Sequence, residues 1–138
     1  MKFLDTNVIL RFLTRDHPQQ SAAVLPLLEQ IAAGTLTVTV SEAVLMETEH
    51  VLSSRLLYNL PRADIARHLD LVLSLRGLRT PDKAIYRRAV AIYAAVNVDL
   101  ADALTVAHME RQGISTVLSF DRDFDRFPAI RREEPSAP

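Results

Sequence analysis

The sequence predicts an α/β fold with a mainly parallel sheet, because three observations agree. Short apolar or β-branched runs alternate along the chain with amphipathic segments of helical period. Capping residues stand where one pattern gives way to the next. Strands that alternate with helices imply parallel pairing through right-handed crossovers. In such sheets the functional crevice lies at the carboxyl ends of the strands.

In the first half of the chain we expect a strand over 2–4, a helix over 8–13, a helix from Pro18 to Gly34, a strand over 35–40 and a helix from Ser41 to about Leu57. Two further helices begin at Pro61 and Pro81. The remainder is expected to form a very short strand over 97–99, a helix from Asp99 to Gly113, a strand over 115–120 and an edge strand over 129–131. The helix starts rest on Ser41, Asp99 and Thr80 as caps and on proline at first helical positions. Glycine ends two of the helices.

The bulk composition fits one ordinary globular domain. The chain has 138 residues, 49% apolar and 24% charged, which is enough for a sizeable core. We expect a single domain over 1–132 and a disordered tail over 133–138. The sequence has no cysteine, which excludes disulfides, thiolate metal sites and a cysteine nucleophile.

Charge and hydropathy set the expected compartment and partners. No run of 18 apolar residues and no secretory leader is evident, so a cytoplasmic protein is expected, with no membrane association. A net charge of -1 argues against a uniformly basic protein that coats nucleic acid. Arginine supplies 14 of the 16 basic residues, however, and its guanidinium suits phosphate or an acidic partner; a high-GC genome explains the bias equally well.

Four carboxylates stand at or inside apolar runs rather than on polar faces. They are Asp5, Glu47, Asp102 and Asp121. Carboxylates are rarely buried unless they are paired, protonated or bound to a metal. Four that emerge from four core-forming elements therefore suggest a shared cation. Asp123 is the alternative to Asp121 as the fourth ligand, since both follow the same strand.

Each carboxylate also has a structural explanation. Asp5 is equally suited to cap the next helix, and Asp99 with Asp102 resembles a capping pair. Glu47 borders the apolar stripe of its helix, but a salt bridge to arginine would also account for it. On the same helix, Glu49 is expected to be a solvent-exposed charge.

Hard oxygen ligands of this kind suit Mg²⁺ or Mn²⁺. Such a cation lowers the pKa of a bound water and neutralises charge on a leaving oxygen, which is the chemistry of phosphodiester hydrolysis. The four histidines (His17, His50, His68 and His108) have no metal-ligand spacing, and no Ser-His-Asp set is evident. The carboxylates therefore predict a divalent-metal phosphodiesterase.

Four segments of the chain resemble the acidic motifs of the PIN-domain ribonucleases, most closely the VapC-type toxins of bacterial toxin-antitoxin pairs. The segments are 3–10 (FLDTNVIL), 40–47 (VSEAVLME), 99–104 (DLADAL) and 118–124 (LSFDRDF). The second motif places the family glutamate on Glu47, and the third is carried by Asp102. The fourth has Ser119 where the family often has threonine, which keeps the hydroxyl.

The resemblance implies a three-layer α/β/α domain with a central, mainly parallel sheet of four to five short strands. It implies a Mg²⁺- or Mn²⁺-dependent endoribonuclease that cleaves a structured RNA and inhibits translation. It also implies a homodimer and a small VapB-like antitoxin that inserts a segment, and naturally an arginine, into the acidic cleft. Residues beside the expected cleft are candidates for substrate binding: Thr6, Asn7, Ser119, Arg11, Arg15 and Arg122.

Two other functions compete with this one. One is a phosphatase with an aspartate nucleophile after the first strand. Such an enzyme usually has a positioned lysine and a second acid two residues after the nucleophile, whereas this chain has Asn7 at that position. A catalytically silent PIN-like module that binds RNA or protein is the stronger rival. Silent members should have lost acidic positions, whereas every one is filled here.

Overall fold

The computed structural model describes all residues from Met1 to Pro138. Its elements are β1 (Lys2–Phe3), α1 (Thr6–Thr14), α2 (Pro18–Ala33), β2 (Val38–Thr39), α3 (Glu42–Ser53), α4 (Arg62–Leu73), α5 (Lys83–Ala95), α6 (Leu100–Gln112), β3 (Thr116–Leu118), the 3₁₀ helix η1 (Arg122–Arg126) and β4 (Arg131–Glu133). The predicted α/β class, with helices layered around parallel strands, is confirmed.

Capping accounts for most helix boundaries. The Ser41 hydroxyl accepts the amide of Val44 at the start of α3. The imidazole of His17 accepts the amide of Gln20 at the start of α2. Gly34 and Gly113 end α2 and α6 in the left-handed conformation, with φ of 80° and 69°. These starts and stops agree with the sequence because caps are local signals.

Among the longer helices, two boundaries differ from prediction. The helix expected to reach Leu57 ends at Ser53, because residues 54–59 form turns in which Leu57 and Asn59 donate to the Ser54 carbonyl. The helix expected at Pro81 begins at Lys83. Thr80 does not cap it, because its buried hydroxyl donates to the Val40 carbonyl instead.

The four strands are all parallel, and they form two separate two-stranded sheets. In one, Lys2 of β1 pairs with Val38 of β2, and a bridge from Val38 to Leu78 extends it. In the other, Leu118 of β3 pairs with Glu133 of β4. Glu133 therefore belongs to a strand rather than to the predicted tail. The first residue of β4 is Arg131, two residues later than the first residue of the expected edge strand.

No strand forms over 97–99, contrary to prediction. The Val98 amide donates to the Val96 carbonyl, and the Val98 carbonyl accepts from the side chain of Arg62. A side chain thus takes the place of a neighbouring strand, which the local pattern of the sequence does not reveal.

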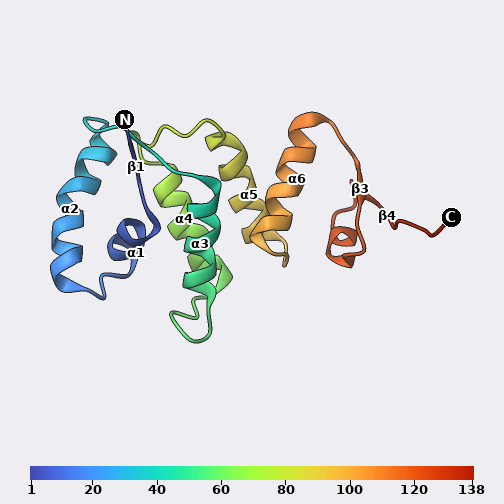
Figure 1. The fold of residues 1–138 in the computed structure, drawn as a ribbon, viewed down its shortest axis with the longest axis horizontal. Helices are drawn as coiled ribbons and strands as arrows, with labels where there is room; N and C mark the ends of the chain where they lie inside the picture. The colour runs from blue at the N-terminus through green and yellow to red at the C-terminus, as the bar shows by residue number, and fades with distance from the viewer.

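The core lies among the helices. One cluster of 30 buried residues runs through α1 to α6, with Ile31, Leu52, Leu73 and Ala103 wholly shielded from solvent. In Figure 1 the helices α3, α4 and α5 occupy the middle of the elongated molecule, with β1 toward one end. The β3–η1–β4 segment lies beyond α6 at the opposite end. None of the helices is both long and apolar enough to cross a bilayer.

Candidate functional site

Three carboxylates gather where α6 meets the segment after β3. One oxygen each of Asp102, Asp121 and Asp123 lies within 4.8 Å of the other two. Asp102 stands in the first turn of α6, whose buried residues Leu100 and Ala103 fix that turn in the core. Two of the four predicted acidic positions and the alternative to the fourth therefore come together in space.

The turn after β3 is held by its own polar groups. The Asp121 amide donates to the Ser119 hydroxyl at 2.9 Å, and the Asp123 amide donates to the Asp121 carboxylate at 2.8 Å. Asp121 thereby caps η1 with one of its carboxylate oxygens. The same bonds place both carboxylates on the side that faces Asp102.

Crowded carboxylates perturb one another. Burial raises the pKa of Asp102, and the charges of Asp121, Asp99 and Asp123 raise it further. A raised pKa means that the ionised form is disfavoured while no cation is bound. The donor set consists of oxygen atoms alone, which fits a hard divalent cation such as Mg²⁺ or Mn²⁺. The cluster is thus electrostatically suited to a cation.

Asp5 and Glu47 lie outside this group. Asp5 is exposed and accepts the Asn7 amide at 3.5 Å, so it caps α1. Glu47 is exposed on α3. The sequence predicts that the strands before Asp5 and Asp121 share one sheet, whereas β1 and β3 belong to different sheets. The structure therefore does not bring these two acids to the other three.

The polar residues after Asp5 occupy contrasting positions. Thr6 is only 2% exposed, and its buried hydroxyl has no hydrogen-bond partner. Asn7 is exposed and lines an open pocket of about 280 Å³ with Val8, Arg11 and residues of α2. The structure therefore places the Thr6 hydroxyl inside the protein and the Asn7 side chain at its surface.

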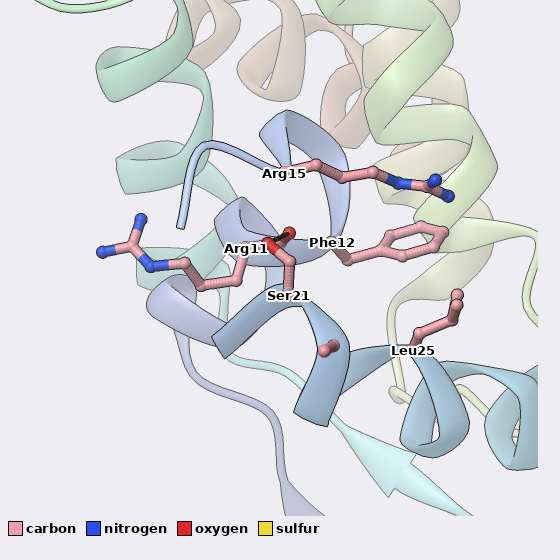
Figure 2. Close-up of a pocket in the computed structure, with 6 residues that line it drawn as sticks. Arg11, Phe12, Arg15, Ser21 and Leu25 are labelled. Carbon is pink, nitrogen blue, oxygen red and sulfur yellow. Dashed lines mark hydrogen bonds between the residues drawn. The ribbon is translucent and has the colours of Figure 1, made fainter. Parts of the chain in front are cut away.

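Arg11 of α1 and Arg15, the C-cap of α1, do not converge on one ligand. Both line a pocket of about 210 Å³ between α1 and α2, whose remaining lining includes Phe12 and Leu25. Figure 2 shows the guanidinium of Arg11 pointing away from that of Arg15, which lies along Phe12. Arg11 is engaged already, because it donates to Gln20 at 2.6 Å and lies 3.5 Å from Asp16. Arg15 forms no ion pair and is exposed.

Near the carboxylates, Arg122 is exposed and Arg126 lies 3.5 Å from Asp123. Ser119 orients the turn rather than pointing a free hydroxyl at the cluster, since that hydroxyl accepts the Asp121 amide. Asp99, predicted to be a capping residue, stands at the helix start but makes no side-chain capping bond.

The sequence reasoning missed three residues near the site. Arg132 is 11% exposed and donates to the Ser119 carbonyl and to Asp125, which ties β4 to the acidic turn. Arg62 and Tyr93 lie behind the first turn of α6. Each makes contacts over long sequence separations, for which no local pattern exists. A partial signal was available for Tyr93, because it recurs at helical spacing with Tyr86 and Ala89 on the buried face of α5.

The prediction that Glu49 is a solvent-exposed charge is wrong. It is half-buried rather than a solvent charge, and it accepts a hydrogen bond from the Tyr93 hydroxyl at 3.0 Å. The neighbouring α5 covers this position of α3, and helical periodicity in α3 alone does not reveal that.

The chain matches a known family model and is similar to a characterised protein. The family model of the PIN domain matches residues 2–130. A protein of Aquifex aeolicus (strain VF5), named VapC ribonuclease, is 26% identical over 126 residues, which cover 91% of this chain and 91% of that protein.

Proposed function

The chain belongs to the PIN domain family, and from this premise we propose that it is a divalent-metal endoribonuclease, the toxin of a toxin-antitoxin pair. The observation that carries the proposal is the approach of Asp102, Asp121 and Asp123 to within 4.8 Å. These residues lie in the third and fourth acidic segments of the sequence. A relative named VapC ribonuclease, similar over almost its whole length, supports the choice of RNA as substrate.

In this proposal Asp102 and Asp121 hold Mg²⁺ or Mn²⁺, and Asp123 is the alternative to Asp121. A bound divalent cation supplies Lewis-acid stabilisation of the phosphodiester and a more acidic water. The carboxylates would hold that cation in place. The exposed Arg122 offsets the negative field for an approaching phosphate, with Ser119 holding the turn.

Asp5 and Glu47 are proposed to complete the site. In the structure β1 and β3 lie in separate sheets toward opposite ends of the molecule. If β3 instead paired in parallel beside β1, Asp5 and Asp121 would come to the same sheet edge, because both follow the carboxyl ends of their strands. The edges that would meet carry exposed apolar side chains: Phe3 is 78% exposed and Leu118 is 71% exposed. Their burial would favour the pairing. The exposed Asn7 and Arg15, with the half-buried Arg11 beside them, would then flank the bound RNA, whereas the buried Thr6 would support the turn from inside the protein.

The remaining parts of the proposal concern partners. We propose a homodimer in the cytoplasm that cleaves a structured RNA and inhibits translation. A VapB-like antitoxin would block the cleft by pairing an arginine with its carboxylates, since guanidinium and carboxylate form bidentate bonds.

A catalytically silent module that binds RNA or protein is the alternative. The separation of Asp5 and Glu47 from the other acids favours it. Metal binding separates the two: a functional site gains melting temperature with Mn²⁺, whereas a silent module does not.

The deciding experiment is RNA cleavage by the purified protein with Mn²⁺ or Mg²⁺, beside Asp102→Asn. Asp64→Asn is the matched control, because Asp64 occupies the first turn of α4 as Asp102 does in α6. We expect defined cuts that disappear with EDTA and with Asp102→Asn but persist with Asp64→Asn. Equal cleavage by all three proteins would reveal a contaminant, and cleavage by none, together with no thermal shift, would favour the silent module.

A further inference from the structure

Arg62 holds the segment that leads into the first turn of α6. It is the first residue of α4, and its guanidinium reaches across to the end of α5 and to the loop after it. One terminal nitrogen donates to the Val98 carbonyl at 2.7 Å and to the Tyr93 carbonyl at 3.1 Å. The other donates to the Asn97 side-chain oxygen at 3.1 Å.

These acceptors would otherwise lack donors from the helices. Tyr93 stands in the last turn of α5, where carbonyls have no partner within the helix. Val98 is buried, and its carbonyl is not part of any strand. A cation at a helix C-terminus also interacts favourably with the helix dipole. Arg62 thus joins the end of α5 to the segment that begins α6.

The same guanidinium stacks on a buried aromatic ring. Its central carbon lies 4.1 Å from the centre of the Tyr93 ring, a cation–π geometry. The hydroxyl of Tyr93 donates to Glu49 of α3 at 3.0 Å. Burial and the Glu49 carboxylate raise the pKa of Tyr93, so the hydroxyl stays protonated and remains a donor. Glu49 stands two residues after Glu47 on α3.

From this chain of contacts we propose that Arg62 and Tyr93 form a positioning pair for the metal ligands, and the proposal rests on the proposed function. Arg62 fixes the backbone at Val98, one residue before Asp99 and four before Asp102. Tyr93 links that point to α3, the helix of Glu47. The pair touches no proposed ligand and acts by setting where the first turn of α6 stands.

The test uses three variants of the full chain. Arg62→Met keeps the aliphatic stem and removes the donors, and Arg62→Lys keeps the charge and the stacking but not the planar set of donors. Arg67→Met is the matched control, because Arg67 lies on the same helix, its side chain is 76% exposed, and its one ion pair is with Asp64. Two readouts are measured: the affinity for Mn²⁺ from thermal shift, and hydrogen exchange at the Ala103 amide.

The Ala103 amide reports on the first turn of α6 without any metal, because it donates to the Asp99 carbonyl at 2.9 Å. For Arg62→Met we expect roughly tenfold weaker Mn²⁺ binding, the scale seen when a residue behind a metal ligand is lost, and faster exchange at Ala103. Arg62→Lys should recover part of both effects, and Arg67→Met should change neither.

The outcomes separate this proposal from the proposed function. If Arg62→Met melts at a lower temperature but binds Mn²⁺ as wild type does, with Ala103 exchange unchanged relative to the rest of α6, the residue only stabilises the fold and the positioning role is wrong. If wild type itself binds no Mn²⁺, the proposed function is overturned. Exchange at Ala103 then still decides whether Arg62 positions α6.

Discussion

The helical region from α3 to α6 and the C-terminal region over 114–138 are held together in different ways. The helices bury large apolar side chains, among them Leu52, Leu69 and Leu73. In the C-terminal region Phe124 is the one buried residue, and Ile114, Leu118 and Phe120 are exposed.

Polar contacts compensate in part for this difference. Arg132 donates to the Ser119 carbonyl at 3.0 Å and to Asp125 at 3.0 Å, and these bonds join β4 to the turn that carries the acids. Exposed ion pairs stabilise a structure much less than a packed core does. Two of the three clustered carboxylates therefore stand on the region with the weaker attachment. Local opening of this region should separate Asp121 and Asp123 from Asp102 without unfolding the helices.

The largest effect is expected from the helical core. Leu73→Ala removes a side chain with no exposed surface, and it should lower the free energy of unfolding by about 2 to 5 kcal/mol. Leu71→Ala on the same helix is the control, because Leu71 is exposed. Urea denaturation measures both. Similar losses for the two variants would contradict the assignment of the core to this face of α4.

Phe124→Ala should act locally. We expect the opening free energy of 114–133 to fall by about 1 to 3 kcal/mol, the usual range for a destabilising substitution, while the main thermal transition moves little. Hydrogen exchange measures the first and calorimetry the second. Phe120→Ala is the exposed counterpart in the same region. A large drop of the main transition would mean that the two regions unfold as one unit.

Arg132→Gln should loosen the acidic turn more than Arg131→Gln does. The Arg131 side chain is 77% exposed and lies 3.4 Å from Glu133, its one carboxylate partner, whereas Arg132 bonds the turn itself. The expected result is weaker Mn²⁺ binding and faster exchange at the Asp121 and Asp123 amides for Arg132→Gln. Equal behaviour of the two variants would show that β4 alone keeps the turn in place.

The smallest effect concerns pH. The pKa of Asp102 is raised in the folded protein, so its contribution to stability is fully present below its ordinary pKa and is lost as pH rises through the folded value. At neutral pH, Asp102→Asn should therefore stabilise the metal-free protein, by less than about 1 kcal/mol because the group is partly solvated.

The measurement for Asp102→Asn is unfolding free energy between pH 3 and 8 without metal. The difference from wild type should shrink toward acid, where Asp102 is protonated in both states. A large loss of stability at all pH values would instead assign Asp102 to the capping of α6.

The sequence predicted what depends on neighbouring residues. The starts of α2 and α3 follow from the caps His17 and Ser41. The helix α6 starts after Asp99 as predicted, although the Asp99 side chain makes no capping bond. The three clustered acids were among the predicted ligands. It did not predict what depends on distant partners. The Arg62 side chain bonds the Val98 carbonyl where a strand was expected, and Thr80 bonds the Val40 carbonyl instead of capping α5, which begins two residues later than expected.

The separation of Asp5 from the clustered acids also depends on distant parts of the chain. Its position after a strand was predicted, but which strand lies beside β1 is a property of the whole fold. Hydrophobic pattern identifies a strand far better than it identifies the neighbour of that strand.

The unpaired edges of β1 and β3 have a practical consequence for anyone who purifies this protein. Each edge has unpaired backbone donors and acceptors next to an exposed apolar side chain, Phe3 on β1 and Leu118 on β3. Edges of this kind pair with other chains and lead to aggregation. A net charge of only -1 gives little electrostatic repulsion between molecules, so concentrated samples should precipitate. Low protein concentration during refolding, or expression together with a polypeptide that covers these edges, should raise the yield of monodisperse material.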